Sequence, residues 1–240
     1  MAISQALRVA KVLAYAAGVP PYAAIMRYLL DTATDDAARL RHVNRIAFRG
    51  WNVRHAQVES EVLGLLAEIR ARGVLRAVEI GTAHGGTLCL LMHALSPGGT
   101  LVSVDLPDGD FGAGYPKWKV PLLHALAWGH VDLALLRADS QTQQTRSVVE
   151  LRLGGQADFI LIDGDHSYEG ARRDYELYRG LVRPGGLLAF HDIVPGDESK
   201  VGGVPRLWKE LRELHKARAR ELVEDWNQGG YGIGLLDVSA

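Results

Sequence analysis

The chain has 240 residues, of which 48% are hydrophobic, and it carries a formal net charge of −1 at pH 7. This hydrophobic content excludes global disorder, and the near-zero charge argues against broad electrostatic binding to nucleic acid. The only cysteine, Cys89, has no partner for an intramolecular disulfide or a cysteine-based zinc site, so we expect a cytoplasmic protein.

Residues 1–54 are expected to form a helical N-terminal extension, with helices over about 3–17 and 21–47. The apolar stretch VLAYAAGVPPYAAIM is interrupted by a glycine and two prolines, so it is too broken to span a membrane. We expect the extension to pack on the main domain or on a second subunit, and we expect a homodimer. The alternative is a helix that docks on a membrane surface or on another partner.

Arg41, Arg45 and Arg49 recur at helical spacing within this extension. One interpretation is a solvated or subunit-contact face. The other is recognition of an anionic acceptor, such as a nucleotide-linked or carrier-linked sugar.

Residues 55–240 are expected to form one α/β domain. A helix over 55–73 comes first, and short apolar runs that suit buried strands then alternate with helical segments. Such alternation predicts a Rossmann-like, doubly wound, mostly parallel sheet of about seven strands, closed by an antiparallel C-terminal hairpin strand. The strands are expected at 75–80, 100–105, 133–137, 158–162, 186–192, 221–226 and 231–238, and the helices at 85–95, 119–129, 141–153, 168–182 and 204–219.

A glycine turn follows the first predicted strand in VEIGTAHGG. Gly81 and Gly85 allow a sharp turn and a close approach of the backbone to a ligand, with Glu79 just ahead of them. The spacing differs from the G-x-G-x-x-G of dinucleotide enzymes, and no phosphate loop follows. By itself this pattern is weak, because many tight strand–helix turns contain two glycines.

Polar residues also follow the next two predicted strands. Asp105 ends the second strand, where a carboxylate can accept both hydroxyls of a ribose. Asp139 and Ser140 follow the third strand and can hydrogen-bond an adenine edge. The alternatives are that Asp105 merely ends a strand and that Ser140 caps the next helix.

The segments VEIGTAHGG, VSVD, RADS, LIDGDHSYEG and LVRPGGLLAFHDI, in this order, resemble a class I S-adenosylmethionine-dependent methyltransferase. The resemblance covers about residues 55–240 and is most specific over 158–193. More narrowly, the chain is similar to a bacterial group that includes sugar O-methyltransferases of macrolide biosynthesis and proteins labelled cephalosporin hydroxylases. The resemblance implies a methionine side formed by Glu79, Gly81 and Gly85, a ribose ligand in Asp105, and adenine contacts from Asp139 and Ser140.

Asp163 follows the fourth predicted strand, and His191 and Asp192 end the fifth. Adjacent strands lie about 4.8 Å apart, so these side chains can converge on one ion. In the metal-dependent O-methyltransferases that the chain resembles, an acidic residue here joins an acidic or amide pair on the next strand. Asp163 and Asp192 match this arrangement, whereas His191 departs from it. All-oxygen ligands suit Mg²⁺, and a histidine ligand moves the preference toward Mn²⁺ or a later transition metal.

His166 lies three residues beyond Asp163, where the fourth helix is expected to begin. A histidine with an ordinary pKa of about 6.5 suits a general base, and the related sugar methyltransferases have a histidine at the matching place. We therefore predict that His166 and Asp163 are catalytic. The alternative is a helix entry that His166 and Ser167 cap.

Two loops at the ligand end of the sheet are candidates for acceptor contacts. The first, 106–121, carries Phe111, Tyr115 and Trp118, which either stack on the acceptor or anchor an ordered loop. The second, 195–205, is glycine-rich and is predicted to be a mobile flap.

The sequence thus predicts an enzyme that moves a methyl group from S-adenosylmethionine to a hydroxyl of a small molecule, a sugar or a glycosylated natural product. A histidine base and a divalent metal, Mg²⁺ or Mn²⁺, are expected to assist. A nicotinamide-dependent oxidoreductase is the first alternative, disfavoured by the glycine spacing. A non-catalytic scaffold that retains the cofactor fold is the second.

Overall fold

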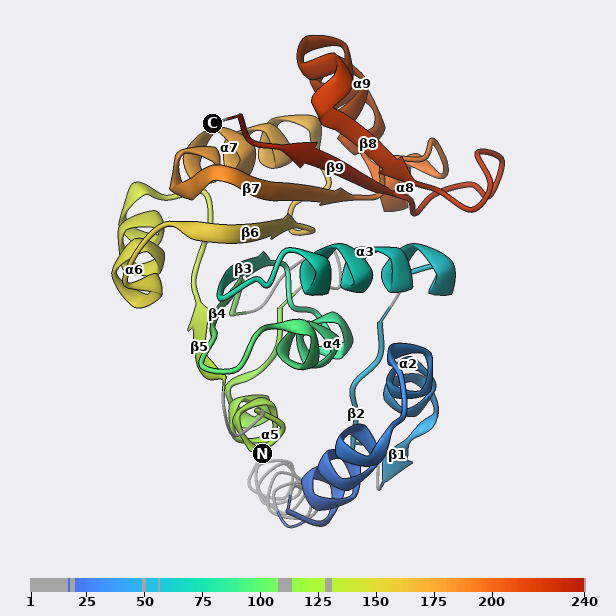
Figure 1. Ribbon diagram of the computed structural model, residues 1–240, viewed down its shortest axis with the longest axis vertical. Coiled ribbons are helices and arrows are strands. Elements are labelled where there is room, and N and C mark those ends of the chain that lie inside the picture. The colour runs from blue at the N-terminus through green and yellow to red at the C-terminus, as the bar shows by residue number, and fades with distance from the viewer. Residues whose placement is uncertain are drawn as a thin grey trace, which may run out of the picture.

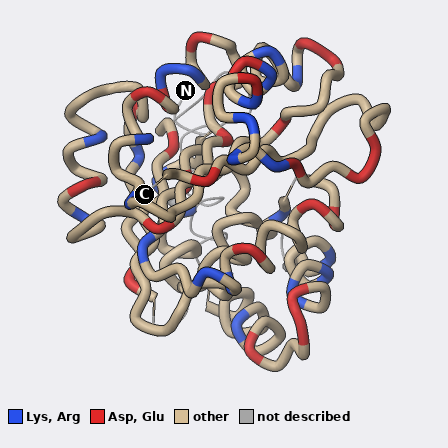
Figure 2. The backbone as a smooth tube through the Cα atoms, turned by 45° about the horizontal axis from the view of Figure 1, so that its top comes forward, with Lys and Arg blue, Asp and Glu red and all other residues tan. Residues whose placement is uncertain are grey.

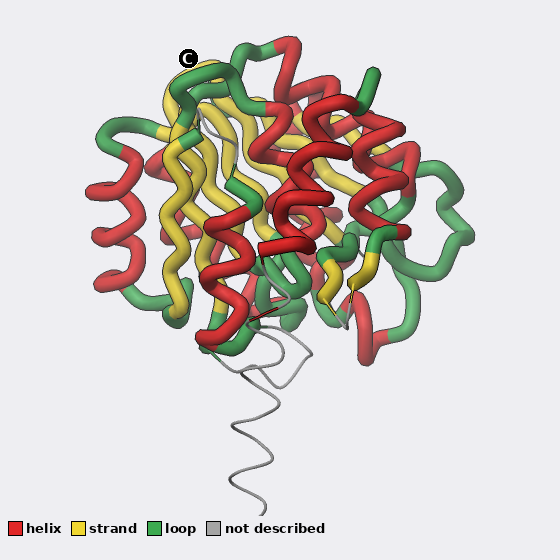
Figure 3. Tube along the Cα trace, turned by 90° about the horizontal axis from the view of Figure 1, so that it is seen from below, coloured by secondary structure: helices red, strands yellow, loops and turns green. Residues whose placement is uncertain are grey.

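The computed structural model describes residues 17, 20–48, 51–55, 57–107, 114–127 and 131–239. Within these residues one seven-stranded sheet forms the centre of the molecule, with helices on both sides (Figures 1 and 3). Its strands, in spatial order, are β5 (Asp132–Arg137), β4 (Thr100–Asp105), β3 (Arg76–Ile80), β6 (Ala157–Ile162), β7 (Val182–His191), β9 (Ile233–Asp237) and β8 (Ala219–Leu222).

The strands from β5 to β7 pair in parallel, whereas β9 is antiparallel to both of its neighbours. β6 shows why the sheet lies inside the molecule: all six residues of ADFILI are buried. A strand covered on both faces needs apolar side chains at consecutive positions. This arrangement confirms the predicted α/β fold with its mostly parallel sheet and antiparallel C-terminal hairpin.

Two hydrophobic clusters cover the two faces of the sheet. Along β6, Phe159 and Leu161 point into one cluster, and Ile160 and Ile162 point into the other. The helices of the first cluster are α2 (Asp36–Arg45), α3 (Glu59–Ala71), α4 (Gly86–Ala94), α5 (Val120–Ala125) and residues 20–32. The second cluster contains α6 (Gln143–Leu153), α7 (Tyr168–Tyr178) and α9 (Val204–His215).

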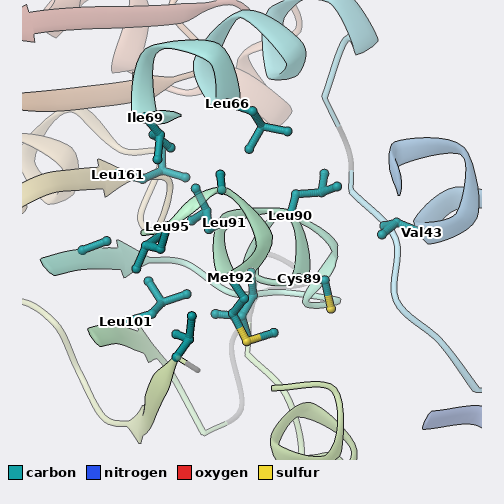
Figure 4. Packing of buried hydrophobic residues seen from close by; sticks show 14 of the residues in the cluster. Val43, Leu66, Ile69, Cys89, Leu90, Leu91, Met92, Leu95, Leu101 and Leu161 are labelled. Atoms are coloured by element: carbon teal, nitrogen blue, oxygen red, sulfur yellow. The ribbon is translucent and has the colours of Figure 1, made fainter. Parts of the chain in front are cut away.

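The N-terminal extension shares the first of these cores. Tyr22, Met26 and Leu30 of the 20–32 helix are fully buried, as is Val43 of α2. Figure 4 shows Val43 beside the side chains of α4, with Leu66 and Ile69 of α3 on the other side. The extension therefore packs on the main domain, which was one of the two predicted arrangements. No helix among the described residues is long and apolar enough to cross a membrane.

Several predicted boundaries in the first half of the chain are wrong. The expected helix 21–47 is two helices, because Asp35 adopts an extended backbone and accepts a hydrogen bond from the Ala38 N–H at 2.7 Å. The chain then forms a small hairpin of β1 (Ala47–Phe48) and β2 (Trp51–Asn52) before α3. The predicted helix 3–17 lies outside the described residues except for residue 17.

The second half of the chain also departs from its predicted bounds. Two predicted helices end early in 3-10 turns, η2 (Arg179–Leu181) and η3 (Lys216–Arg218), so that β7 and β8 begin before the expected positions. The connection between η1 (Lys117–Lys119) and β4 includes residues 108–113, which lie outside the described residues. The predicted flap 195–205 contains a short helix, α8 (Glu198–Val201).

Strand order reverses at β3, which lies between β4 and β6. In open α/β sheets such a reversal leaves a crevice beyond the carboxyl ends of the strands, and ligands bind there. Charges of both signs are interspersed over the rest of the described trace (Figure 2). The crevice is therefore where the functional residues should be sought.

Candidate active site

A cavity of about 570 Å³ opens at the carboxyl ends of β3, β6 and β7. Its lining includes the Gly81–His84 turn and Asp105. It also includes residues 54, 55 and 57, part of α8, and part of the connection between β8 and β9. Asp163, His166, His191 and Asp192 complete the lining.

The glycine turn brings the ends of β3 and β6 together. Gly81 has a φ of +93°, and a Cβ at this position would lie 1.8 Å from the carbonyl oxygen of Asp163. Gly85 has a φ of +83°, but its α-carbon faces the side chain of Leu123 in α5. Gly81 therefore lines the cavity, whereas Gly85 allows close packing and starts α4.

Asp105 holds the glycine turn in place. One carboxylate oxygen accepts hydrogen bonds from the N–H groups of Thr82 and Ala83 at 2.9 and 2.8 Å, and the other accepts from Leu106 at 2.7 Å. Burial raises the pKa of Asp105, and these backbone donors oppose that effect only in part. The residue predicted to bind ribose thus lines the cavity and also orders the turn.

Glu79 lies beneath the turn and is fully buried. Its carboxyl group accepts a hydrogen bond from the Ser103 hydroxyl at 2.9 Å, and Ser103 is in turn bonded to the Thr82 hydroxyl. Burial raises the pKa of Glu79 well above its usual value. Glu79 is not among the residues that line the cavity, so it can act on a ligand only through the turn.

The two predicted adenine residues lie outside the cavity lining. Asp139 accepts a hydrogen bond from the Gln141 N–H at 2.8 Å, and the carbonyl group of Ser140 accepts one from the Tyr178 hydroxyl at 3.0 Å. Asp174 lies nearby on α7 and is fully buried. Burial raises its pKa to about 7, and the carboxylates of Asp165 and Asp139 act in the same direction.

Asp163, His191 and Asp192 bring one ligand atom each to within 4.8 Å of the others. The Nδ1 atom of His191 lies 3.0 Å from an Asp163 oxygen, and Gln57 donates a hydrogen bond to the second oxygen at 3.2 Å. The Nε2 atom of His191 is buried, and it has no hydrogen-bond partner among the described residues. Two carboxylates and an imidazole at these distances fit a divalent cation.

Asp192 adopts a left-handed backbone conformation, with a φ of +62°. Aspartate tolerates this conformation better than most residues, but it still stores strain. The Asp192 carboxylate accepts a hydrogen bond from the Tyr231 N–H at 3.1 Å. The turn after β7 is thereby tied to the β8–β9 connection.

His166 points toward the carboxylates of Asp163 and Asp192. We call Asp163, His191 and Asp192 the acidic group. Its Nδ1 atom lies 3.2 Å from an Asp192 oxygen, and its Nε2 atom lies 3.6 Å from an Asp163 oxygen. The nearby Asp163 carboxylate raises the pKa of His166 to about 9, although burial opposes the shift. Burial would raise the pKa of Asp163, but His191 and His166 hold it well below its usual range.

The N-cap of α7 is Ser167, whose hydroxyl accepts a hydrogen bond from the Gly170 N–H at 3.0 Å. His166 takes no part in this cap. Its Nδ1 atom lies 2.5 Å from the carbonyl oxygen of Lys200 in α8. The helix-capping alternative therefore describes Ser167 and not His166.

Sequence reasoning missed several residues of the cavity wall. Arg54, His55 and Gln57 come from the segment before α3, and Gln228 to Tyr231 come from the connection between β8 and β9. No motif marks these positions in the sequence. Tyr115 is buried, which favours the anchoring interpretation over stacking on an acceptor. Phe111, Arg49 and the side chain of Trp118 lie outside what the structure describes.

A model of the methyltransferase-domain family matches residues 78–193, from β3 to the turn after β7. This part of the chain therefore matches a methyltransferase domain. Over 176 residues the chain is 24% identical to caffeoyl-CoA O-methyltransferase 2 of Zea mays. The aligned region covers 71% of this chain and 62% of the maize protein.

Solved methyltransferase structures have the same fold. The O-methyltransferase TomG of Streptomyces achromogenes, solved with S-adenosylmethionine, superposes with a TM-score of 0.58 at 17% identity. This comparison covers 92% of this chain and 99% of TomG. An O-methyltransferase from Bacillus cereus, solved with S-adenosylhomocysteine, gives a TM-score of 0.56 at 19% identity, covering 91% and 99% of the two chains. This chain therefore shares its fold with these O-methyltransferase structures.

Proposed function

We propose that the protein transfers a methyl group from S-adenosylmethionine to a hydroxyl group of a small molecule. The observation that supports this most directly is the cavity at the strand reversal of a methyltransferase domain. Its lining combines two groups of different chemistry, a glycine turn with Asp105 and an acidic group with His166. The maize, Streptomyces and Bacillus relatives are O-methyltransferases.

The turn side suits the cofactor. Gly81 lines the cavity with its backbone, and the Asp105 carboxylate can accept the two ribose hydroxyls. Glu79 and Gly85 support the turn from behind, and Asp139 with Ser140 lies beyond the end of β5, where the adenine edge is expected. We assign these six residues to cofactor binding.

The acidic side suits the acceptor. Methyl transfer is an in-line displacement at carbon, so the protein must orient the acceptor hydroxyl and take its proton. His166 lines the cavity and can accept that proton once its imidazole is neutral. The close contacts with Asp163 and Asp192 fix the orientation of the ring.

We further propose that Asp163, His191 and Asp192 hold a divalent cation. The imidazole donor favours Mn²⁺ over Mg²⁺. When bound, such an ion acidifies a hydroxyl group and offsets the negative charge that raises the pKa of His166. Gln57 orients the Asp163 carboxylate from the other side.

A sugar or glycosylated natural product is the proposed acceptor, because the cavity presents polar groups suited to hydroxyls. A phenolic acceptor is the second candidate, favoured by the likeness to a caffeoyl-CoA O-methyltransferase. We also propose a cytoplasmic homodimer. Ile25 and Tyr28 on the N-terminal helix are 43% and 67% exposed, which supports contact with a second subunit there.

Calorimetric titration with S-adenosylhomocysteine and with NAD tests the proposal. The wild type should bind S-adenosylhomocysteine and not NAD. Asp105→Ala should weaken that affinity by about 1.5–3 kcal/mol, the scale of lost hydrogen bonds to a charged group. Binding of NAD alone would contradict the proposed function, and unchanged affinity in a folded Asp105→Ala variant would remove Asp105 from the ribose site.

A further inference from the structure

Glu61 is a buried carboxylate in the first turn of α3, 2% exposed. One oxygen accepts hydrogen bonds from the Glu224 N–H at 3.1 Å and from the Gln228 side chain at 2.8 Å. The other oxygen accepts from the Gly232 N–H at 2.9 Å. Within the described residues no Lys or Arg forms an ion pair with it, so these donors and the start of α3 must stabilise its buried position.

All three donors belong to residues 224–232, which we call the 224–232 loop and which connects β8 to β9. Its second half has an unusual backbone. The φ angles of Gly229, Gly230, Tyr231 and Gly232 are +75°, +134°, +62° and +81°. A tyrosine rarely adopts a positive φ, and such conformations persist only where surrounding contacts hold them.

The same loop forms part of the cavity wall. Gln228 to Tyr231 line the cavity on the side of the acidic group. The Tyr231 N–H donates to Asp192, and the centroid of the Tyr231 ring lies 6.1 Å from that of His191. Figure 1 shows the start of α3 and the β8–β9 connection at the same end of the sheet. Glu61 does not line the cavity, but its hydrogen bonds hold residues that do.

We infer that Glu61 is a positioning residue, whose carboxylate holds the 224–232 loop in the shape that sets Gln228 and Tyr231 along the acceptor side of the cavity. This inference rests on the proposed function only in taking this part of the cavity to bind the methyl acceptor. Removal of the carboxylate leaves three glycines free to relax to other conformations. The cofactor side, built from β3 and β4, has no contact with Glu61 among the hydrogen bonds of the described residues.

A merely structural role would consist of joining α3 to β8 and β9. Glu68, on the same helix, joins these elements away from the cavity through Arg220, at 2.7 Å. Glu68→Ala therefore serves as the matched control: it removes a carboxylate contact between the same elements but none with the 224–232 loop.

The first measurement is hydrogen–deuterium exchange of the full chain without ligands. In Glu61→Ala, exchange at residues 228–232 should be at least about tenfold faster than in the wild type. Glu61→Gln, which keeps one acceptor oxygen, should recover part of the protection, and Glu68→Ala should change it less than about twofold. Unaltered exchange in Glu61→Ala, or an equal change in Glu68→Ala, overturns the inference.

The second measurement separates an effect on acceptor binding from an effect on cofactor binding. S-adenosylhomocysteine affinity should remain within about twofold in all three variants. With caffeoyl-CoA, catechol or UDP-glucuronate, whichever the wild type methylates, the acceptor KM should rise at least about fivefold in Glu61→Ala and less in Glu61→Gln. Equal changes in the KM values of acceptor and S-adenosylmethionine overturn the inference. If none of these acceptors is methylated, the hydrogen–deuterium exchange result alone tests the inference. A wild type that does not bind S-adenosylhomocysteine contradicts the proposed function and leaves the exchange result intact.

Discussion

The protonation of His166 depends on side chains that lie within 4 Å of it. Asp163 and Asp192 approach the two ring nitrogens and raise the pKa of His166 to about 9. Below that pH the imidazole holds its proton and cannot act as a base, unless the negative charge beside it is offset. The same contacts that orient the ring therefore also govern the pH at which it can work.

His166→Ala should lower turnover by about 10²–10⁴-fold, the range for loss of a general base. Turnover should recover in part as pH rises, because hydroxide then replaces the missing base. Affinity for S-adenosylhomocysteine should stay unchanged by calorimetry, since the polar partners of His166 among the described residues are Asp163, Asp192 and Lys200 and not the glycine turn. Near-normal turnover in this variant would mean that the base lies elsewhere.

At the scale of elements, the site exists because the ends of β6 and β7 lie side by side in a parallel pair. Asp163 directly follows β6, His191 ends β7 and Asp192 follows it. Asp192 has a left-handed backbone conformation. Three residues separated by up to 29 positions in the sequence thereby lie close enough together to hold one ion.

Chelator should lower wild-type turnover, and added Mn²⁺ should restore it more effectively than Mg²⁺. Asp163→Ala and Asp192→Ala should abolish the response to either metal, with little further loss in chelator. The pH at which wild-type turnover is half-maximal should be near 9 in chelator and lower with Mn²⁺. Full activity in chelator would show that these carboxylates position the acceptor without a metal.

The alternation of strands and helices was predictable from the sequence, because buried parallel strands need continuous apolar runs. β4 has the predicted bounds, 100–105, and the convergence of Asp163, His191 and Asp192 follows from their places at the ends of adjacent strands. The break at Asp35 depends on a cap that competes with a continuous helical pattern. Glu61 was not predictable, since its partners lie 163–171 residues away and their donors are set by backbone conformation.

At the scale of the whole molecule, both faces of the sheet are closed by hydrophobic clusters, and a few ionisable groups are enclosed with them. Asp174 is the clearest case, with no exposed surface and a pKa raised to about 7 by burial. In the unfolded chain this carboxyl group ionises near its ordinary value of 3.8. Folding therefore favours its protonated form, which makes the free energy of unfolding depend on pH.

Because the pKa of the Asp174 carboxyl group is raised in the folded protein, the free energy of unfolding falls as pH rises. The contribution of Asp174 is complete below about pH 3.8 and declines as pH rises to about 7, by up to about 4 kcal/mol. Asp174→Asn should remove this decline, so the variant should gain stability relative to the wild type between pH 5 and pH 8. Urea unfolding at several pH values measures the difference. A parallel pH dependence in the two proteins would contradict the assignment to Asp174.

The reversed strand β9 has a consequence for synthesis of the chain. β9 lies between β7 and β8 in the sheet, yet it follows both of them in the sequence. As the polypeptide leaves the ribosome, the backbone edge of β7 stays unpaired while α8, α9 and β8 emerge, and β8 has no neighbour to join. An open edge beside the apolar run LLAF is a template for pairing with other chains. A nascent chain that stalls before residue 233 is therefore at greatest risk of aggregation, and completion of β9 ends that risk.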